Sequence, residues 1–252
     1  MESHDVQVLA NVLEDTKPEA HTRRRLIQLA AAGGGALALG GATPALAQRK
    51  GESPRRILNS LATAESFGVT FLTEAIRRAP GTPSEGLVET LKAANTAEYD
   101  HVVALRRLGG RHFTLRFWIP DAAFGGGGAG LFESIETADT VELMGYLTGT
   151  TAFAKRGNER AARFLAEGCA VESEHRAIAR FAQTALGGRQ QISIDRSFAP
   201  WSIKTAAGMI RALEDAGIGF GERGPEPGAF YDFPGDPVAN GVGLENAGRR
   251  PV

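Results

Sequence analysis

A chain of 252 residues, 42% of them hydrophobic, is long enough to fold into one domain with its own core. Its formal net charge of −1 provides no basic surface of the kind that binds nucleic acid, so we expect no nucleic-acid partner. Cys169 is the only cysteine, which excludes an intrachain disulfide and any metal site built from several thiolates.

The first 47 residues have the pattern of an export signal. A twin-arginine pair, Arg23 and Arg24, precedes a weakly apolar stretch rich in Ala and Gly, and the small-residue cleavage site Ala45-Leu46-Ala47 follows. We therefore predict a twin-arginine signal peptide over residues 1–47 and a periplasmic or extracellular protein with no stable membrane insertion after cleavage. The alternative is an uncleaved membrane anchor, since the apolar stretch is nearly long enough to span a bilayer.

Two helices are predicted next. Ser53 followed by Pro54 is typical of a helix start, and apolar residues then recur every three or four positions up to the breaker at residues 80–83. The second helix is predicted to begin at Ser84 and to end before the glycines at 109–110. The short connection between them favours an antiparallel hairpin.

Residues 111–130 show no helical period and contain several aromatic residues and a run of four glycines. We interpret this stretch as a long crossover whose aromatic side chains pack along the outside of a helical bundle. Such a crossover is needed when the third helix must begin at the end of the bundle opposite to the one where the second helix finishes.

Two more long helices follow the crossover. The third is predicted to run from Leu131 to about Lys155, and Asn158 is a suitable N-cap for the fourth, which ends at the glycines 187–188. Residues 53–188 are thus interpreted as a four-helix region and 189–252 as an extension. That extension is predicted to contain one short helix at about 202–216 and a Gly/Pro-rich tail without regular structure that does not join the core.

Six polar residues interrupt the apolar stripes of the four long helices. They are two Glu-x-x-His pairs and one lone glutamate on each of the other two helices: Glu65, Glu98, His101, Glu142, Glu172 and His175. Residues i and i+3 share one face of a helix, so a Glu and a His at this spacing can bind the same ion or two adjacent ions. In each hairpin the lone glutamate and the paired glutamate are equidistant from the turn to within one residue, which places them at the same level.

Four carboxylates and two imidazoles at one level predict a site for two iron or manganese ions. The alternative interpretations are a buried ion-pair network or a coincidence of spacing. Asp139 lies off the apolar stripe of its helix, together with Glu133 and Glu136, and we expect these three on a solvated face. Cys169 and Tyr146 are expected to have packing roles in the core.

Glu65 and the segments AEYDH (97–101), VELMGYLTG (141–149) and VESEH (171–175) resemble the ferritin-like superfamily. The resemblance is closest to exported ferritin-like proteins related to plant desiccation-associated proteins, and it covers about Ser53 to Leu186. It implies an all-α, ferritin-like four-helix bundle with a left-handed crossover between the second and third helices. The family pattern implies a di-iron or di-manganese centre and carries over onto these residues: Glu65, Glu98, His101, Glu142, Glu172 and His175.

These features together predict an exported di-iron or di-manganese protein whose small-molecule partners are metal ions and O₂ or peroxide. Its expected activity is that of an oxidase, a ferroxidase or a peroxide-consuming enzyme. The alternative function is that of a non-catalytic metal-binding protein related to stress or desiccation. The sequence is also compatible with an oligomer.

Overall fold

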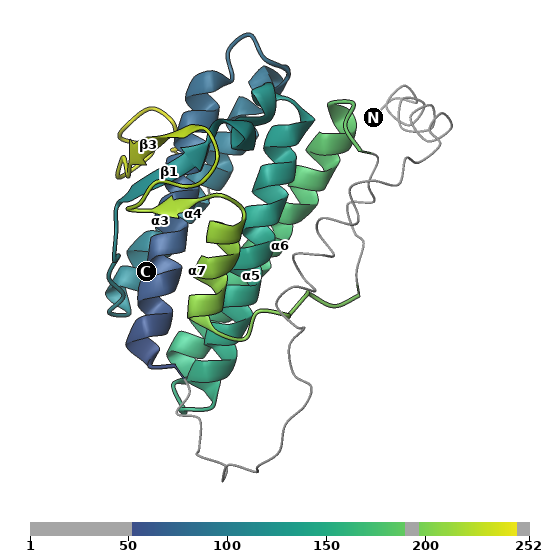
Figure 1. Ribbon diagram of the computed structural model, residues 1–252. Helices are drawn as coiled ribbons and strands as arrows, with labels where there is room; N and C mark the ends of the chain where they lie inside the picture. Colours follow the sequence, from purple (N-terminus) through teal and green to yellow (C-terminus); the bar gives the residue numbers. More distant parts are fainter. Residues whose placement is uncertain (1–51, 190–196, 246–252) are drawn as a thin grey trace, which may run out of the picture. The chain divides into compact units, whose positions relative to one another are not determined.

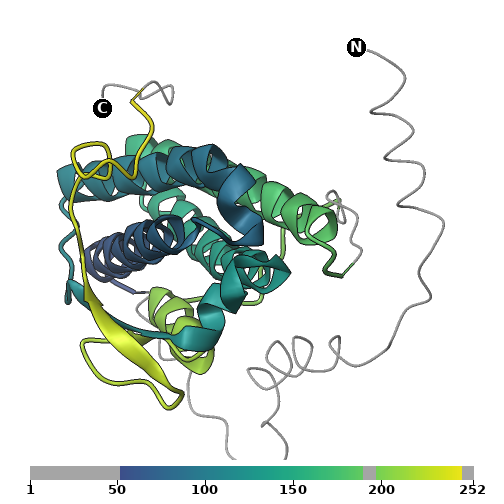
Figure 2. The same cartoon turned by 90° about the horizontal axis from the view of Figure 1, so that it is seen from above.

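The computed structural model describes residues 52–189 and 197–245 (Figure 1). This part of the chain is mostly helical. Its long helices, which lie side by side (Figure 2), are α3 (Pro54–Arg78), α4 (Val88–Arg107), α5 (Ala129–Ala154) and α6 (Glu159–Ala185). No helix within these ranges has the length and apolar content that crossing a bilayer requires. The predicted signal peptide, residues 1–47, lies outside the described residues.

The predicted starts of the first and fourth helices are confirmed by their caps. Ser53 Oγ accepts a hydrogen bond from Arg56 N at 3.2 Å, and Asn158 Oδ1 accepts one from Ala161 N at 3.1 Å. The second helix begins later than predicted, because the 3₁₀ turn η1 (Pro83–Leu87) precedes α4. The short helix in the extension, α7 (Ala206–Asp215), lies inside the predicted range.

The structure corrects the prediction of a tail without regular structure. Strands β2 (Gly219–Phe220) and β3 (Gly228–Asp232) pair antiparallel with β1 (Arg116–Pro120) in the order β2-β1-β3. β1 lies in the crossover and is followed by the 3₁₀ turn η2 (Asp121–Gly127). The chain is therefore mostly helical with a small three-stranded sheet, and it is not purely α-helical.

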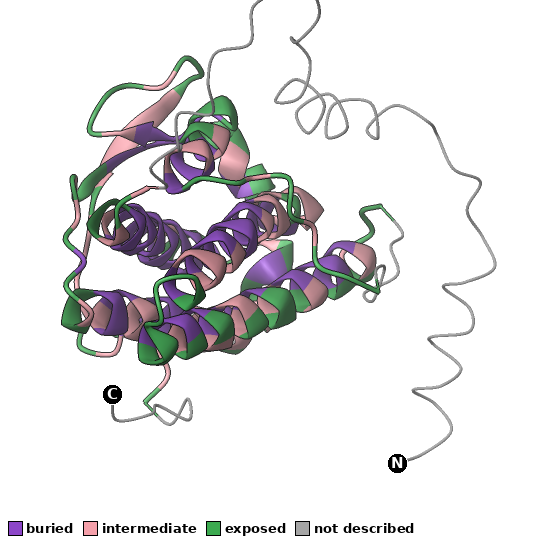
Figure 3. Ribbon diagram, turned by 90° about the horizontal axis from the view of Figure 1, so that it is seen from below, coloured by how far each residue is buried: buried purple, intermediate pink, exposed green. Residues whose placement is uncertain are grey.

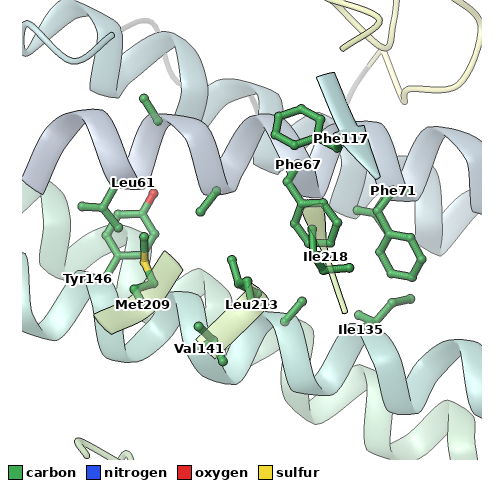
Figure 4. Close-up of a cluster of buried hydrophobic side chains, with 14 of the residues drawn as sticks. Leu61, Phe67, Phe71, Phe117, Ile135, Val141, Tyr146, Met209, Leu213 and Ile218 are labelled. Atoms are coloured by element: carbon green, nitrogen blue, oxygen red, sulfur yellow. The ribbon is translucent and has the colours of Figure 1, made fainter. Parts of the chain in front are cut away.

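The crossover is less peripheral than its sequence suggests. Phe117 of β1 is fully buried and contacts Phe67 of α3 edge to face, with ring centroids 6.0 Å apart. Figure 4 shows these rings at one end of a hydrophobic cluster between α3, α5 and α7. Figure 3 shows that the buried residues gather on the faces that the helices turn toward one another.

Two glycines of α5 allow the other helices to pack closely against it. A Cβ at Gly145 would lie 2.1 Å from Met209 Sδ of α7, and a Cβ at Gly149 would lie 2.8 Å from Leu165 Cδ1 of α6. A larger residue at Gly145 would force the Met209 side chain to move. Apolar side chains fill the space beside both glycines.

The tail also reaches the core, contrary to expectation. Val242 is only 7% exposed, and its carbonyl oxygen accepts a hydrogen bond from Asn95 Nδ2 of α4 at 3.0 Å. The same amide nitrogen donates to Thr73 Oγ1 of α3 at 3.2 Å, and Leu244 N donates to Thr96 Oγ1 at 2.9 Å. Asn95 of α4 therefore joins the tail to α3.

We predict that removing residues 218–252 destabilises the bundle, because the deletion uncovers β1 and removes Ile218 and Val242 from the core. The expected loss in the free energy of unfolding is about 3 kcal/mol or more, measured by urea denaturation. V242A alone should lower it by about 1–2 kcal/mol. L115A, at an exposed apolar residue, is the matched control and should have little effect. Equal stability of the shortened and full chains would contradict the prediction.

Candidate metal centre

Seven polar side chains from the four long helices gather inside the bundle. Each helix contributes at least one: Glu65 from α3, Glu98 and His101 from α4, Asp139 and Glu142 from α5, and Glu172 and His175 from α6. The five carboxylate residues are at most 5% exposed. The two histidine side chains are 12% and 10% exposed, so they form the outer side of the cluster.

One group of ligand atoms surrounds His101. Its Nδ1 lies 3.2 Å from Glu65 Oε2 and 3.2 Å from Glu172 Oε1, and Glu98 completes the group. One oxygen or nitrogen atom from each of these four residues lies within 4.8 Å of the others. His101 Nδ1 is hydrogen-bonded to Glu65, and it lies equally close to Glu172, with which the protonated imidazole forms an ion pair.

A second group surrounds His175. Its Nδ1 lies 3.1 Å from Glu98 Oε1 and 3.6 Å from Glu172 Oε2, and Asp139 is the fourth member. Glu98 and Glu172 thus belong to both groups. Each of the two groups could hold a metal ion.

The structure corrects one assignment on α5. Asp139, predicted on a solvated face, is buried and belongs to the group around His175. Glu142, predicted as a ligand, is also buried but belongs to neither group. It lies one helical turn further along α5, and burial and the charges of Glu98 and Glu65 raise its pKa well above the usual value.

Asp139 was missed because α5 packs against α3, α6 and α7 and is buried on most of its surface. When a helix is buried on most sides, the position of a residue relative to the apolar stripe no longer indicates whether its side chain points into the core or toward solvent. Glu136, on the same side, is also not simply solvated, since it accepts a hydrogen bond from Arg180 Nε at 2.7 Å. Glu133 is exposed, as predicted.

Buried oxygen atoms without a hydrogen-bond partner indicate that a cation fits here. Among the described residues these include one oxygen each of Glu65, Glu98, Asp139 and Glu142, and both oxygens of Glu172. A buried carboxylate oxygen without a partner is strongly unfavourable. Mixed carboxylate and imidazole ligands suit iron and manganese.

The alternative of a buried ion-pair network accounts for this cluster less well. Even with both histidines protonated, two positive charges face five carboxylates. Arg176 of α6 adds one nearby positive charge, which acts on Asp139. Neutrality without a metal therefore requires protons on two of the carboxyl groups as well as on both histidines, whereas two divalent ions with Arg176 balance five carboxylates.

Two neighbours of the centre have the packing roles expected from the sequence. Tyr146 is buried with its ring edge-on to His101 at 5.7 Å between centroids, and burial and the Glu65 carboxylate raise its pKa. Gly168 makes room for this ring, since a Cβ there would lie 2.7 Å from Tyr146 Cε1. Cys169 packs against the hydrophobic core, and burial raises the pKa of its thiol to about 11.

His112 was assigned no role from the sequence. Its Nδ1 lies 2.8 Å from Ser66 Oγ, and its ring lies 5.9 Å from that of Phe233 in the tail. His112 therefore joins the crossover to α3 directly beside Glu65. No local sequence pattern predicts a contact of this kind, because the residues that form it are far apart in the chain.

Comparison of this chain with protein-family models, with curated proteins and with solved structures finds no match. The ferritin-like family is therefore a resemblance carried by the sequence motifs. A metal-binding role is supported by the distances, burial and charge of the seven residues.

The pKa values of the residues in the cluster are shifted strongly from their usual values. Burial raises the pKa of Glu65, Asp139 and Glu142, and charge repulsion between the carboxylates adds to this. For His101 and His175 burial opposes protonation, but the adjacent carboxylates raise the pKa of both well above the usual value. Burial also opposes ionisation of Glu172, but the two imidazoles lower its pKa to about 2.

We predict that the metal-free protein loses stability as the pH rises from about 5 to 9. Groups with a raised pKa hold their protons longer in the folded chain than in the unfolded one, so folding takes up protons. The stability that they contribute is complete below their unfolded pKa and is lost as the pH passes their folded pKa. Each retained proton contributes a slope of up to about 1.4 kcal/mol per pH unit.

Urea denaturation in the presence of a chelator, repeated across this pH range, measures the slope. E142Q removes one group with a raised pKa and should make the slope shallower, whereas E174Q, on the exposed side of α6, should leave it unchanged. Stability that increases from pH 5 to pH 9 would contradict the assignment of raised pKa values.

Proposed function

We propose that this protein binds two iron or manganese ions in the cluster described above. The observation that supports this most is that both ligand groups share Glu98 and Glu172. These two carboxylates would bridge the ions. His101 with Glu65 would complete one site and His175 with Asp139 the other, while Glu142 is the alternative terminal carboxylate that the sequence indicated.

The helical arrangement supports the proposal of a ferritin-like bundle. α3 packs against α4, and α5 packs against α6, so the long helices form two hairpins joined by the crossover. Each hairpin contributes one Glu-x-x-His pair and one or two further carboxylates. This internal repetition favours a centre with two similar metal positions.

We further propose that the centre is an oxidoreductase site acting on O₂ or peroxide. A bound pair of redox-active ions would supply the electron transfer. The chain itself holds the carboxylates in fixed positions, excludes bulk water by burial, and presents its two histidines at the most exposed side of the cluster. The twin-arginine motif favours an exported protein that folds around its metal before leaving the cytoplasm.

A non-catalytic metal-binding protein, related to stress or desiccation, is the second candidate function. The near-complete burial of the carboxylates favours it, since an enclosed centre retains metal but admits substrates poorly. Both functions require the same ligands, and turnover separates them.

We predict about two iron or manganese ions per chain in protein purified from its host, measured by elemental analysis. E98A/E172A should abolish binding, because it removes both shared carboxylates. D139N should lower the content to about one ion, whereas E142Q should retain about two if Asp139 is the terminal ligand. E174Q is the matched control on α6 and should bind normally. Full metal content in E98A/E172A would overturn the proposed centre.

The second test concerns turnover. Protein loaded anaerobically with Fe(II) should oxidise many equivalents of added Fe(II), or consume many equivalents of peroxide, once O₂ or peroxide is supplied. E98A/E172A should show only the background rate of free iron. A fully loaded protein that reacts once and then stops would contradict the enzymatic function and favour the binding function.

A further inference from the structure

A cleft of about 660 Å³ lies outside the metal centre, between the first turns of α3 and the outer face of α7. Figure 1 shows these two helices side by side. The start of the crossover contributes Phe113 to the lining, and none of the seven residues of the metal centre takes part. The cleft is therefore a separate surface of the same domain.

Positive charge dominates this cleft. Arg55 and Arg56 of α3 and Arg211 of α7 line it, against the single carboxylate of Glu214. Within residues 52–189 and 197–245, none of the three guanidinium groups has an ion-pair or hydrogen-bond partner. Three guanidinium groups around one cleft can bind an anion through paired hydrogen bonds.

The position of two of these arginines is unfavourable for the helix itself. Arg55 and Arg56 lie in the first turn of α3, which contains no acidic residue. The amino end of a helix carries a partial positive charge, so cations there are destabilising and anions are stabilising. An anionic ligand would relieve this repulsion and gain from the helix end as well as from the side chains.

The remaining lining adds a polar group and an apolar wall. Ser60 is only 6% exposed, and its hydroxyl has no hydrogen-bond partner in the described part of the chain. Phe113 is 53% exposed, and Ile210 lies on the α7 side. Clefts with apolar walls and a few convergent polar groups are typical of sites for small organic molecules.

We propose that this cleft binds a small organic anion, in which one carboxylate or phosphate group is carried by a ring-sized apolar body. The acidic group contacts Arg55, Arg56 and Arg211, and the Ser60 hydroxyl provides a further hydrogen bond. The apolar body packs against Phe113 and Ile210. The volume of the cleft accommodates a molecule of this size.

Isothermal titration calorimetry of the full mature chain with phenyl phosphate, benzoate and inorganic phosphate tests this proposal. Phenyl phosphate or benzoate should bind saturably, and the better of the two identifies the acidic group. R55Q/R56Q/R211Q should weaken binding at least about tenfold, because several charge-assisted hydrogen bonds are lost. R106Q/R160Q/R163Q removes the same charge outside the cleft and should change the affinity less than about twofold.

The variant F113A tests the contribution of the apolar wall to binding separately from that of the charged groups. It should weaken binding of the organic anion several-fold and leave inorganic phosphate unaffected, since only the ring loses a contact. No saturable binding, an equal loss in both arginine triple variants, or inorganic phosphate binding as tightly as both organic probes would overturn the proposal. Circular dichroism and metal content should be unchanged in all of these variants, so either result leaves the metal centre untouched.

Discussion

Burial of five carboxylates around two imidazoles is the constraint on which this structure depends. All four long helices contribute to the cluster, and several of its oxygen atoms have no partner among the described residues. A domain of this size has a stability of only about 5–15 kcal/mol, so it cannot keep several bare carboxylates in its interior. Protons or metal ions must neutralise them, which couples folding of the bundle to whatever cation is present.

The sequence predicted the helices well, because helix caps and apolar periodicity are local signals. The Glu-x-x-His pairs at Glu98 and Glu172 were found for a similar reason, because two residues three positions apart lie on the same face of a helix. Asp139 could not be found in this way, because α5 is covered by other elements on most of its surface. The three-stranded sheet was missed because β2 has two residues and pairs with a strand about one hundred positions earlier.

The tail and the buried Glu/His cluster meet at α4. Asn95, whose amide joins Thr73 on α3 to the carbonyl of Val242, precedes Glu98 by three residues. On the same helix, Tyr99 stacks on Phe233 with ring centroids 6.4 Å apart. One side of α4 thus carries ligands and an adjacent side holds the tail. A segment that looked like a solvated extension therefore belongs to the support of a shared ligand.

The close contact at Gly145 bears on where the domain can be cut. Met209 Sδ occupies the space that a side chain would need on α5, only three residues from Glu142. A designer who excised residues 53–188 as a minimal four-helix bundle would remove Met209 and expose the apolar surface beside Gly145 to solvent. A portable form of this cluster therefore has to include α7 besides the four long helices, together with the tail that hydrogen-bonds to α4.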